Sequence, residues 1–190
     1  MGYPSPLGIS PTITVALPLD ENENGMSTFD LRDVAVADTD HLWIALRYAV
    51  AWQAPEPDVR QAQTEAAIRC HVEGWGRPGD IGIAAFTGQD VFAGAAWVRH
   101  FKIAETYGAV KDGVPVLAIG ILAKFRGRGL GTRLLREVMA MAKDHGATEM
   151  SLSVERENSV ALRLYERLGF AVIDDDPGGA LDMLATLSGP

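Results

Sequence analysis

The sequence predicts an α+β domain with a mixed, mostly antiparallel central sheet flanked by helices. Two runs rich in β-branched and small apolar residues, 81–87 and 91–101, flank Gly-Gln-Asp at 88–90, which is typical of a tight hairpin. Strand-like residues 114–122 then lead through an amphipathic helix to another strand-like run at 150–154. A hairpin and a strand-helix-strand crossover have to share one sheet, because a chain of 190 residues forms a single core.

Residues 1–27 are predicted to form an arm outside this domain. They contain four prolines followed by a polar run from Asp20 to Gly25, a composition that does not fold alone. Within the arm, "TITVAL" (12–17) has strand-forming residues that can pair with a sheet edge of the same or a neighbouring subunit, which allows a homodimer. The arm is therefore either flexible or strand-forming, and residues 28–190 make up the folded domain.

The first part of the domain is predicted to contain one strand and two helices. "TFDLRDV" (28–34) is typical of a strand, and Asp38 is placed to cap the helix that follows. The apolar residues of that helix follow helical spacing at Leu42, Ala45, Leu46 and Ala49. A second helix is expected from about Asp58 to Glu73, and "GWGRPGD" (74–80) forms a glycine-proline corner before the hairpin.

The second part alternates strands and helices. The helix after residues 114–122 has one apolar side, formed by Leu130, Leu134, Leu135, Val138, Met141 and Ala142. After the strand at 150–154, residues 159–168 are predicted to form a short helix that ends at Gly169. "AVID" (171–174) and "LDMLATL" (181–187) supply the closing strands.

Composition excludes several classes of protein. The formal net charge is -8, which disfavours binding to nucleic acid or to an anionic membrane and favours a cationic substrate. No apolar stretch has the length of a membrane span, and no signal peptide is recognisable at the start. Cys70 is the sole cysteine, so an internal disulfide is excluded, and we expect a cytoplasmic protein.

The stretch "AKFRGRGLGTRLL" (123–135) places three glycines and three arginines at the start of the predicted helix. The N-terminus of a helix carries unpaired N–H groups and a partial positive charge, so it stabilises an anion such as phosphate. Glycines let the backbone approach that anion closely, and arginine side chains at 126, 128 and 133 can hydrogen-bond phosphate oxygens. The alternative is a glycine-rich connection whose arginines lie in water. The spacing matches neither a P-loop nor the dinucleotide motif.

The residues "RGRGLG" (126–131) resemble the Arg/Gln-x-x-Gly-x-Gly/Ala signature of the GNAT superfamily of acyl-CoA N-acyltransferases. In that superfamily this turn holds the pyrophosphate of coenzyme A. The resemblance implies a GNAT-like fold and a pyrophosphate site formed by Arg126, Gly127, Arg128, Gly129, Leu130, Gly131 and Thr132. It further implies that backbone groups of Ile119, Gly120 and Ile121 face the pantetheine arm and the thioester carbonyl.

A second stretch, "SLSVERENSVALRLYERLGF" (151–170), resembles the strand, asparagine and tyrosine-bearing helix of the same superfamily. The resemblance implies that Asn158 contacts the coenzyme arm and that Tyr165 lies near its sulfur as the catalytic residue. Each has a simpler interpretation: Asn158 caps the helix, alone or in addition to binding, and Tyr165 belongs to the core. The resemblance covers most of residues 28–190 and is weak in the first two helices. The block 73–97 is similar to uncharacterised bacterial members.

The resemblance implies transfer of an acetyl group from acetyl-CoA, as cosubstrate, to a primary amine of a small molecule or peptide by direct attack. Some members carry a glutamate on the fifth strand, where Ser153 stands, or on the fourth, where Val116 or Leu117 stands. The missing acids leave an alternative, a catalytically silent coenzyme A-binding regulatory module. If a base is needed, the remaining choices act through water: Asp80, Glu105 and Glu155.

No metal site is predicted, because His41, His100 and His145 show no ligand spacing. The four tryptophans, at positions 43, 52, 75 and 97, fit either core packing or an aromatic acceptor pocket. A nucleic-acid partner is disfavoured further, since no aromatic residues are interleaved with the arginines at 126–136.

Overall fold

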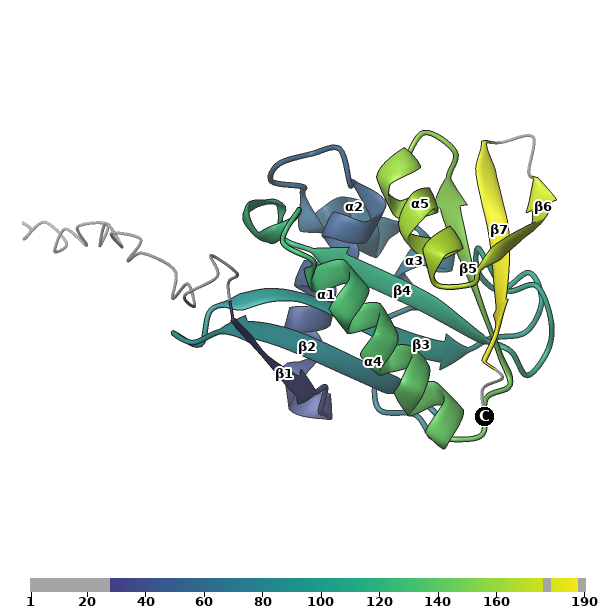
Figure 1. The fold of residues 1–190 in the computed structure, drawn as a ribbon, viewed down its shortest axis with the longest axis horizontal. Helices are drawn as coiled ribbons and strands as arrows, with labels where there is room; N and C mark the ends of the chain where they lie inside the picture. Colours follow the sequence, from purple (N-terminus) through teal and green to yellow (C-terminus); the bar gives the residue numbers. More distant parts are fainter. Residues whose placement is uncertain (1–27, 176–178, 188–190) are drawn as a thin grey trace, which may run out of the picture.

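The structure is a computed structural model that describes residues 28–175 and 179–187. Within these residues the strands are β1 (Phe29–Asp33), β2 (Ile81–Thr87), β3 (Phe92–His100), β4 (Pro115–Ile121), β5 (Glu149–Glu155), β6 (Ala171–Asp175) and β7 (Ala180–Thr186). They form one sheet in the order β1-β2-β3-β4-β5-β7-β6, and every neighbouring pair is antiparallel except β4 and β5 (Figure 1). The predicted mixed, mostly antiparallel sheet is therefore confirmed.

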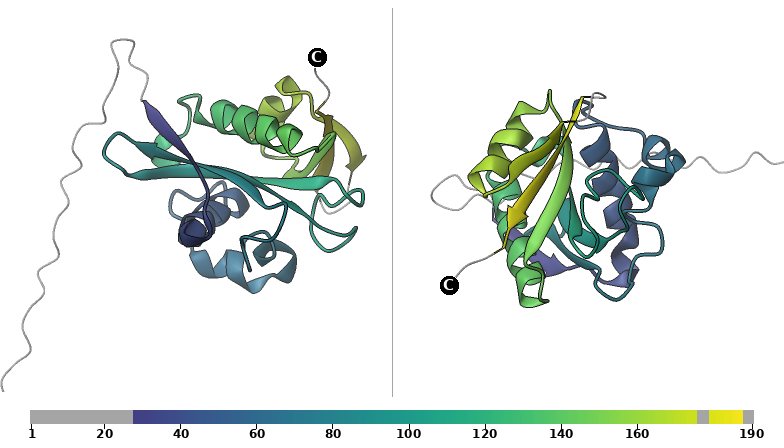
Figure 2. Two further views of the ribbon diagram at one scale, coloured as in Figure 1. Left: turned by 90° about the horizontal axis from the view of Figure 1, so that it is seen from below. Right: turned by 90° about the vertical axis from the view of Figure 1, so that its right-hand side faces the viewer.

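Helices cover both faces of the sheet (Figure 2). One face carries α1 (Thr39–Val50), α2 (Val59–Thr64) and α3 (Ala66–Arg69), and the other carries α4 (Leu130–Asp144) and α5 (Ser159–Arg167). Short 3₁₀ helices, η1 (Val36–Asp38) and η2 (Ala123–Phe125), precede α1 and α4. None of the helices in the described ranges combines the length and apolar character needed to cross a membrane.

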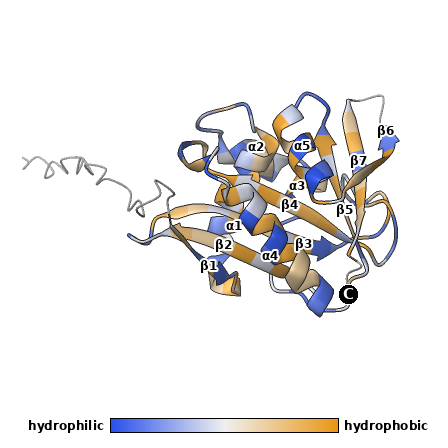
Figure 3. Cartoon of the chain, in the orientation of Figure 1, coloured by the Kyte–Doolittle hydropathy of each residue, from blue (hydrophilic) through white to orange (hydrophobic). Residues whose placement is uncertain are grey.

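The sheet separates two hydrophobic cores. Successive residues of a strand point to opposite faces, so Ile83 and Val98 pack under α4, whereas Ala84 and Trp97 pack under α1. Figure 3 shows the predominantly hydrophobic central strands lying between the helices. Burial on both faces explains why the sequence of β2 and β3 lacks a polar alternation.

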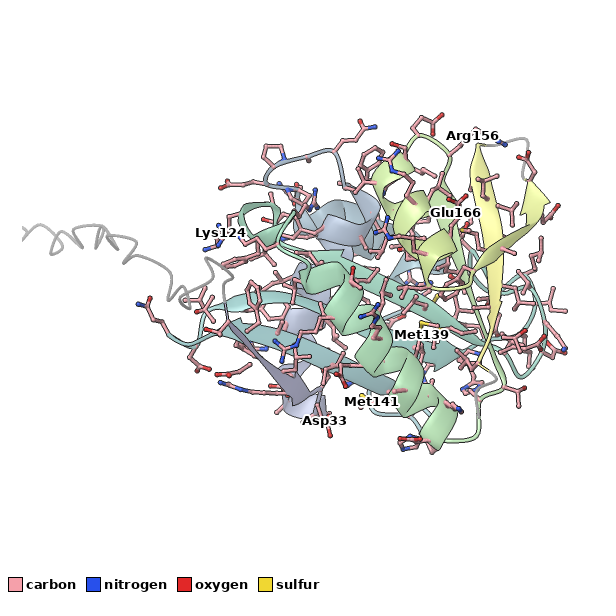
Figure 4. All side chains as sticks on the ribbon, viewed as in Figure 1. Asp33, Lys124, Met139, Met141, Arg156 and Glu166 are labelled. Atoms are coloured by element: carbon pink, nitrogen blue, oxygen red, sulfur yellow. The ribbon has the colours of Figure 1, made fainter. Side chains whose placement is uncertain are left out.

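Helix α4 buries the side that its periodicity predicts. The buried residues are Leu130, Leu134, Leu135, Val138 and Ala142. Met141, also predicted on that side, is half-buried and packs with Met139 against the rim of the core (Figure 4). The next predicted helix is α5, and Gly169 follows it with a φ of 91°, as expected for a glycine that ends a helix.

The single helix expected over residues 58–73 is wrong, because the chain forms α2 and α3 with a break at Glu65. Asp58 caps α2 as predicted, since its carboxylate accepts from the N–H of Arg60 at 2.9 Å. Glu65 is extended, with φ -87° and ψ 122°, and its carboxylate accepts from the Tyr107 hydroxyl at 2.6 Å. A contact distant in sequence therefore accompanies the break. The expected Asp38 cap is also altered: its carboxylate accepts from the N–H of Ala35, at η1 rather than α1.

The predicted N-terminal arm and its strand-forming segment "TITVAL" lie outside the described residues.

The connection between β3 and β4 folds over the sheet and is anchored to α3. The Thr106 hydroxyl donates to the carbonyl of Ala67 and lies 2.7 Å from Nε2 of His71. Because the hydroxyl has one hydrogen, Nε2 of His71 must carry the proton that it shares with Thr106. Nδ1 of His71 is then unprotonated, buried and without a partner among the described residues. Burial, aided by the charge of Arg99, lowers the pKa of His71 from 6.5 to about 4.

This pKa predicts a pH-dependent stability. Between pH 6.5 and about 4 the unfolded chain binds a proton that folded His71 does not, so this contribution is complete above pH 6.5 and is lost as the pH falls through that window. Urea unfolding should show a His71-dependent decrease of about 1.4 kcal/mol per pH unit. His71→Gln should remove that part of the slope, whereas His145→Gln, at an exposed histidine, should not. An unchanged slope in His71→Gln would contradict the assignment.

Candidate active site

The sheet opens between β4 and β5. The two strands pair once, at Val116 and Ser151, and then diverge (Figure 1). Each continues beyond this point, β4 to Ile121 and β5 to Glu155. The facing edges therefore present backbone N–H and C=O groups that have no partner strand, and these groups need another partner.

The backbone groups of Ile119 and Ile121 face this opening. Leu122 donates to the carbonyl of Ala93 at 3.0 Å, and in an antiparallel pair the residues that bond to the neighbouring strand alternate. Gly120 therefore bonds to β3, whereas Ile119 and Ile121 direct their N–H and C=O groups toward β5. Of the three residues predicted to present backbone groups to a ligand, Ile119 and Ile121 thus face the opening and Gly120 faces β3; their contact with a ligand stays a prediction.

Gly120 instead permits close packing of α1. A Cβ atom at this position would lie 1.8 Å from the carbonyl oxygen of Ala45, in the middle of α1. The backbone of the helix therefore lies directly against β4. This contact sets the position of α1, whose end reaches the opening.

The turn at residues 126–131, called the glycine turn below, follows β4 at the open end of the sheet. Gly127 and Gly129 have φ values of 74° and 77°, a conformation that strongly favours glycine, and their Cβ positions face open space. Within the described part of the chain, no hydrogen-bond acceptor is found for the N–H groups of Gly127, Gly129, Leu130, Gly131 and Thr132. No acidic residue lies in the first turn of α4 to compete for them. The turn thus has the unpaired donors that the sequence predicts for an anion site.

The side chain of Arg126 points into the protein rather than into this turn. Its Nε donates to the carbonyl of Ile121 at 2.9 Å, and its two terminal nitrogens donate to the carbonyls of Trp52 and Tyr48 at 2.5 and 3.3 Å. Its backbone N–H donates to Ala123. Arg126 therefore braces the turn against the C-terminal end of α1. Arg133 is similarly engaged, donating to the carbonyl of Phe29 at 2.7 Å.

Helix α5 lies on the α4 side of the opening. Gly131 brings the three elements together, because its Cβ position lies 3.2 Å from Leu164 of α5 and 3.3 Å from Ile121 of β4. Asn158 caps α5, with its side-chain oxygen accepting from the N–H of Ala161 at 3.2 Å. The cap uses only the oxygen, so the amide NH₂ group of Asn158 keeps its donors for another partner.

Tyr165 lies in the core next to Phe170, with ring centroids 5.8 Å apart. Burial raises its pKa well above the usual value, so the phenol is protonated at neutral pH. Its hydroxyl has no hydrogen-bond partner among the described residues. Within the described ranges, Tyr165 is thus a buried hydrogen-bond donor without an acceptor.

The three carboxylates considered as bases lie in different environments. Glu155 accepts from the indole N–H of Trp52 at 2.7 Å and so joins α1 to the end of β5 across the opening. Asp80 is buried in an ion pair with Arg99 at 2.9 Å, which commits it to the structure. Glu105 accepts from the backbone N–H of Lys102. Only Glu155 is placed at the opening.

Sequence patterns did not reveal the contact between Trp52 and Glu155, since 103 positions separate the two residues. Within the described residues, no group of three or more His, Cys, Asp or Glu side chains is arranged to hold a metal ion.

Comparison with known proteins decides the family. The profile of the Acetyltransferase (GNAT) family matches residues 41–170, more than half of the chain. The chain belongs to the GNAT family. Among solved GNAT structures, the PaiA N-acetyltransferase of Thermoplasma acidophilum, in complex with coenzyme A, superimposes with a TM-score of 0.62. The two proteins are 19% identical, and the superposition covers 84% of this chain and 99% of PaiA. The YncA protein of Salmonella typhimurium, solved with acetyl-CoA, gives a TM-score of 0.58 at 21% identity, covering 84% of this chain and 94% of YncA.

Curated relatives are more similar to this chain in sequence than these solved structures are. Mycothiol acetyltransferase of Nocardiopsis dassonvillei is 31% identical over 150 residues, which cover 77% of this chain and 43% of that protein. N-alpha-acetyltransferase 30 of Schizosaccharomyces pombe is 36% identical over 55 residues, which cover 29% of this chain and 37% of that protein. The matched part of the chain thus spans less than half the length of either relative.

The packing at Gly120 predicts a large effect of a single methyl group. Gly120→Ala should destabilise the protein by about 3 kcal/mol or more, because the backbone of α1 has to move away from β4. The matched control is Gly131→Ala, whose methyl group would meet only the flexible ends of Leu164 and Ile121, and whose stability should change by less than about 1 kcal/mol. Urea unfolding measures both. Equal effects would show that α1 is not held against Gly120.

Proposed function

We propose that the chain is an N-acetyltransferase that transfers an acetyl group from acetyl-CoA to a primary amine of a small molecule or peptide by direct attack. The observation that carries this proposal is the alignment of unsatisfied donors around one opening. The N–H groups of Gly127, Gly129, Leu130, Gly131 and Thr132 and the hydroxyl of Tyr165 have no partner among the described residues, and the N–H of Ile119 points toward the opening. These groups come from three elements that meet at Gly131.

Acetyl-CoA fits this set of groups. We assign its pyrophosphate to the turn from Gly127 to Thr132, including Arg128, where the amides and the helix N-terminus stabilise a dianion. Arg126, predicted as a direct ligand, is assigned to positioning the turn, since its guanidinium donates to three protein carbonyls. We assign the pantetheine arm to the opening, beside Ile119, Ile121 and the NH₂ group of Asn158. Gly120 contributes indirectly, because the lack of a side chain lets α1 pack against β4.

The similarities support this assignment without extending it to a particular acceptor. Several relatives are named acetyltransferases, and structures of similar fold are described with coenzyme A or acetyl-CoA. Residues 28–190 are proposed to be the acetyltransferase domain, with residues 1–27 as an arm. The acceptor is proposed to be a small molecule or peptide and not a nucleic acid, in keeping with the net charge of -8.

The chemistry follows from the charges that develop. The amine attacks the thioester carbonyl, and the N–H of Ile119 stabilises the negative charge on its oxygen. When the carbon–sulfur bond breaks, the Tyr165 hydroxyl donates a hydrogen bond to the departing thiolate. A raised pKa disfavours full proton transfer from Tyr165, so it acts by hydrogen bonding, and the amine proton leaves to water.

The need for a base depends on the acceptor. A lysine-like amine with a pKa of about 10.4 costs about 4.6 kcal/mol to deprotonate at pH 7, whereas an α-amine near 8 costs about 1.4 kcal/mol. Asp80 is committed to Arg99, and Glu155 is already hydrogen-bonded to Trp52. We therefore favour an amine of low pKa, with Glu155, at the end of β5, as a carboxylate that borders the opening.

The engagement of these carboxylates also favours a second candidate, a coenzyme A-binding module without catalysis. Thiol release separates the two functions. Wild-type protein with acetyl-CoA and a panel of primary amines should release coenzyme A in an amine-dependent way, with the acetylated amine detected by mass spectrometry. Tight binding of coenzyme A with no release for any amine would favour the silent module.

Tyr165→Phe tests the role of the phenol. The variant removes only a hydroxyl that has no partner in the part of the chain that the structure describes, so its stability should be close to wild type. We expect turnover to fall by about tenfold to a hundredfold, because the leaving thiolate loses its hydrogen-bond donor. The affinity for acetyl-CoA should be unchanged. Steady-state kinetics and calorimetric titration give the two quantities. Unchanged turnover would remove Tyr165 from the mechanism.

A further inference from the structure

Trp52 makes two hydrogen bonds, one toward each edge of the opening between β4 and β5. Its backbone carbonyl accepts from Arg126, whose Nε donates to Ile121 at the end of β4. Its indole N–H donates to the carboxylate of Glu155, at the end of β5, at 2.7 Å. A residue outside the sheet therefore connects the two strands at a level where their backbones no longer pair. We call these two contacts the Trp52 bridge.

The carboxylate of Glu155 points to the face of the sheet that carries α1. Residues alternate between the two faces along a strand, and Glu155 has the opposite orientation to the apolar residues of β5. Those residues belong to the core under α4: Met150, Leu152 and Val154. No Lys, Arg or His in the described ranges forms an ion pair with Glu155, so its carboxylate is available to the indole of Trp52.

Trp52 is held in place by the packing of α1. It lies two residues beyond the helix, in a turn that the N–H of Ala54 closes on the carbonyl of Ala51 at 3.0 Å. The helix is itself fixed on β4, because the carbonyl of Ala45 lies directly against Gly120. Trp52 thus extends from a helix that is anchored to one strand and reaches the other.

The Trp52 bridge crosses the opening next to the group that we assign to the thioester carbonyl. Continuing the parallel register beyond the single paired position of β4 and β5 would place Glu155 beside Gly120. Ile119, whose N–H faces the opening, lies one residue before that level. The opening is therefore bounded at one end by the paired position of the strands and at the other by the bridge.

The proposed chemistry needs donors from both sides of the opening at a fixed separation. The N–H of Ile119 belongs to β4, whereas the hydroxyl of Tyr165 belongs to α5, which follows β5. Backbone pairing does not set the distance between the two strands at this level. Misplacing a reacting group by about 1 Å costs about a hundredfold in rate. The separation therefore has to be set by contacts other than the sheet.

We infer that Trp52 is a positioning residue: held by Arg126 on one side and by Glu155 on the other, it sets the width of the opening in which the pantetheine arm and the thioester lie. This inference rests on the proposed coenzyme A site but not on transfer of the acetyl group. It assigns the carboxylate of Glu155 to holding the indole rather than to accepting the amine proton.

Calorimetric titration with two ligands tests the inference without catalysis. Coenzyme A places its arm in the opening, whereas 3′-phosphoadenosine 5′-diphosphate, its nucleotide half, has no arm and reaches only the glycine turn. Trp52→Phe keeps an aromatic ring and removes the indole N–H, and Glu155→Leu removes the acceptor. Each should weaken coenzyme A about tenfold, which is about 1.4 kcal/mol, and leave the nucleotide half unchanged. Equal weakening of both ligands, or of neither, would overturn the inference.

A conservative variant and a double variant test whether the bond itself is responsible. Glu155→Gln keeps a side-chain oxygen that accepts from the indole, so it should weaken coenzyme A less than Glu155→Leu does. The double variant, Trp52→Phe with Glu155→Leu, should bind about as weakly as either single variant, because both changes break the same bond. For any amine that is acetylated, kcat should fall in the same order. Equal losses in Glu155→Gln and Glu155→Leu, or losses that multiply in the double variant, would contradict the role of the bond.

Two variants serve as controls. Glu157→Leu removes the same charge two residues further along the chain, from an exposed side chain. Trp43→Phe makes the same ring change in the first half of α1. Both should bind coenzyme A and its nucleotide half as the wild-type protein does, and urea unfolding should show that every variant compared is folded. A coenzyme A affinity lowered tenfold in either control would show that the effect is not specific to the bridge.

The indole N–H resonance of Trp52 reports the bond directly by NMR. The sequence has four tryptophans, and Trp52→Phe identifies the resonance by removing it. Exchange of this proton with solvent should be about tenfold faster in Glu155→Leu than in the wild-type protein, with Glu155→Gln between the two. A resonance and exchange rate unaffected by Glu155→Leu would overturn the inference.

The two proposals fail in different ways. If the bridge variants weaken coenzyme A selectively but no amine releases thiol from acetyl-CoA, the acetyl transfer fails and the positioning role of Trp52 remains. If amines are acetylated while Trp52→Phe and Glu155→Leu keep the wild-type affinity for coenzyme A, Trp52 does not position the arm and this inference fails.

Discussion

The loss of pairing between β4 and β5 after Val116 and Ser151 is the constraint on which the rest of the structure depends. A continuous sheet would satisfy the backbone of Ile119 and Ile121 and leave no space between the strands. Because the strands diverge, unpaired donors line an opening that begins beside the glycine turn. Helix α4 follows β4 and helix α5 follows β5, and both helices begin at the open end of the sheet. The N–H groups of their first turns therefore converge there.

Side chains hold the opening where backbone pairing is absent. Arg126 links the glycine turn to the carbonyls at the end of α1, and Trp52 links that same segment to Glu155 at the end of β5. The close contact of Ala45 in α1 with Gly120 in β4 holds the helix against the sheet. The segment at the end of α1 is therefore hydrogen-bonded to both edges of the opening, through Arg126 to Ile121 of β4 and through Trp52 to Glu155 of β5.

The sequence predicted the strands, α4, α5 and the glycine turn, because each depends on local periodicity or on backbone conformations that favour glycine. It did not predict the break at Glu65, which coincides with a contact from Tyr107, nor the bond between Trp52 and Glu155. Such contacts are set by the tertiary arrangement. Arg126 shows the same limit: its place in a phosphate-like motif suggested a ligand, whereas the nearby carbonyls of α1 engage its guanidinium. The direction of the Gly120 backbone depends on strand register, which no motif specifies.

A crystal structure with acetyl-CoA bound tests the central claim most directly. We expect the pyrophosphate within hydrogen-bond distance of the N–H groups of Gly127, Gly129 and Gly131, and the thioester in the opening between the N–H of Ile119 and the hydroxyl of Tyr165. A pyrophosphate bound elsewhere, or β4 and β5 paired along their full length with the thioester outside the sheet, would contradict it.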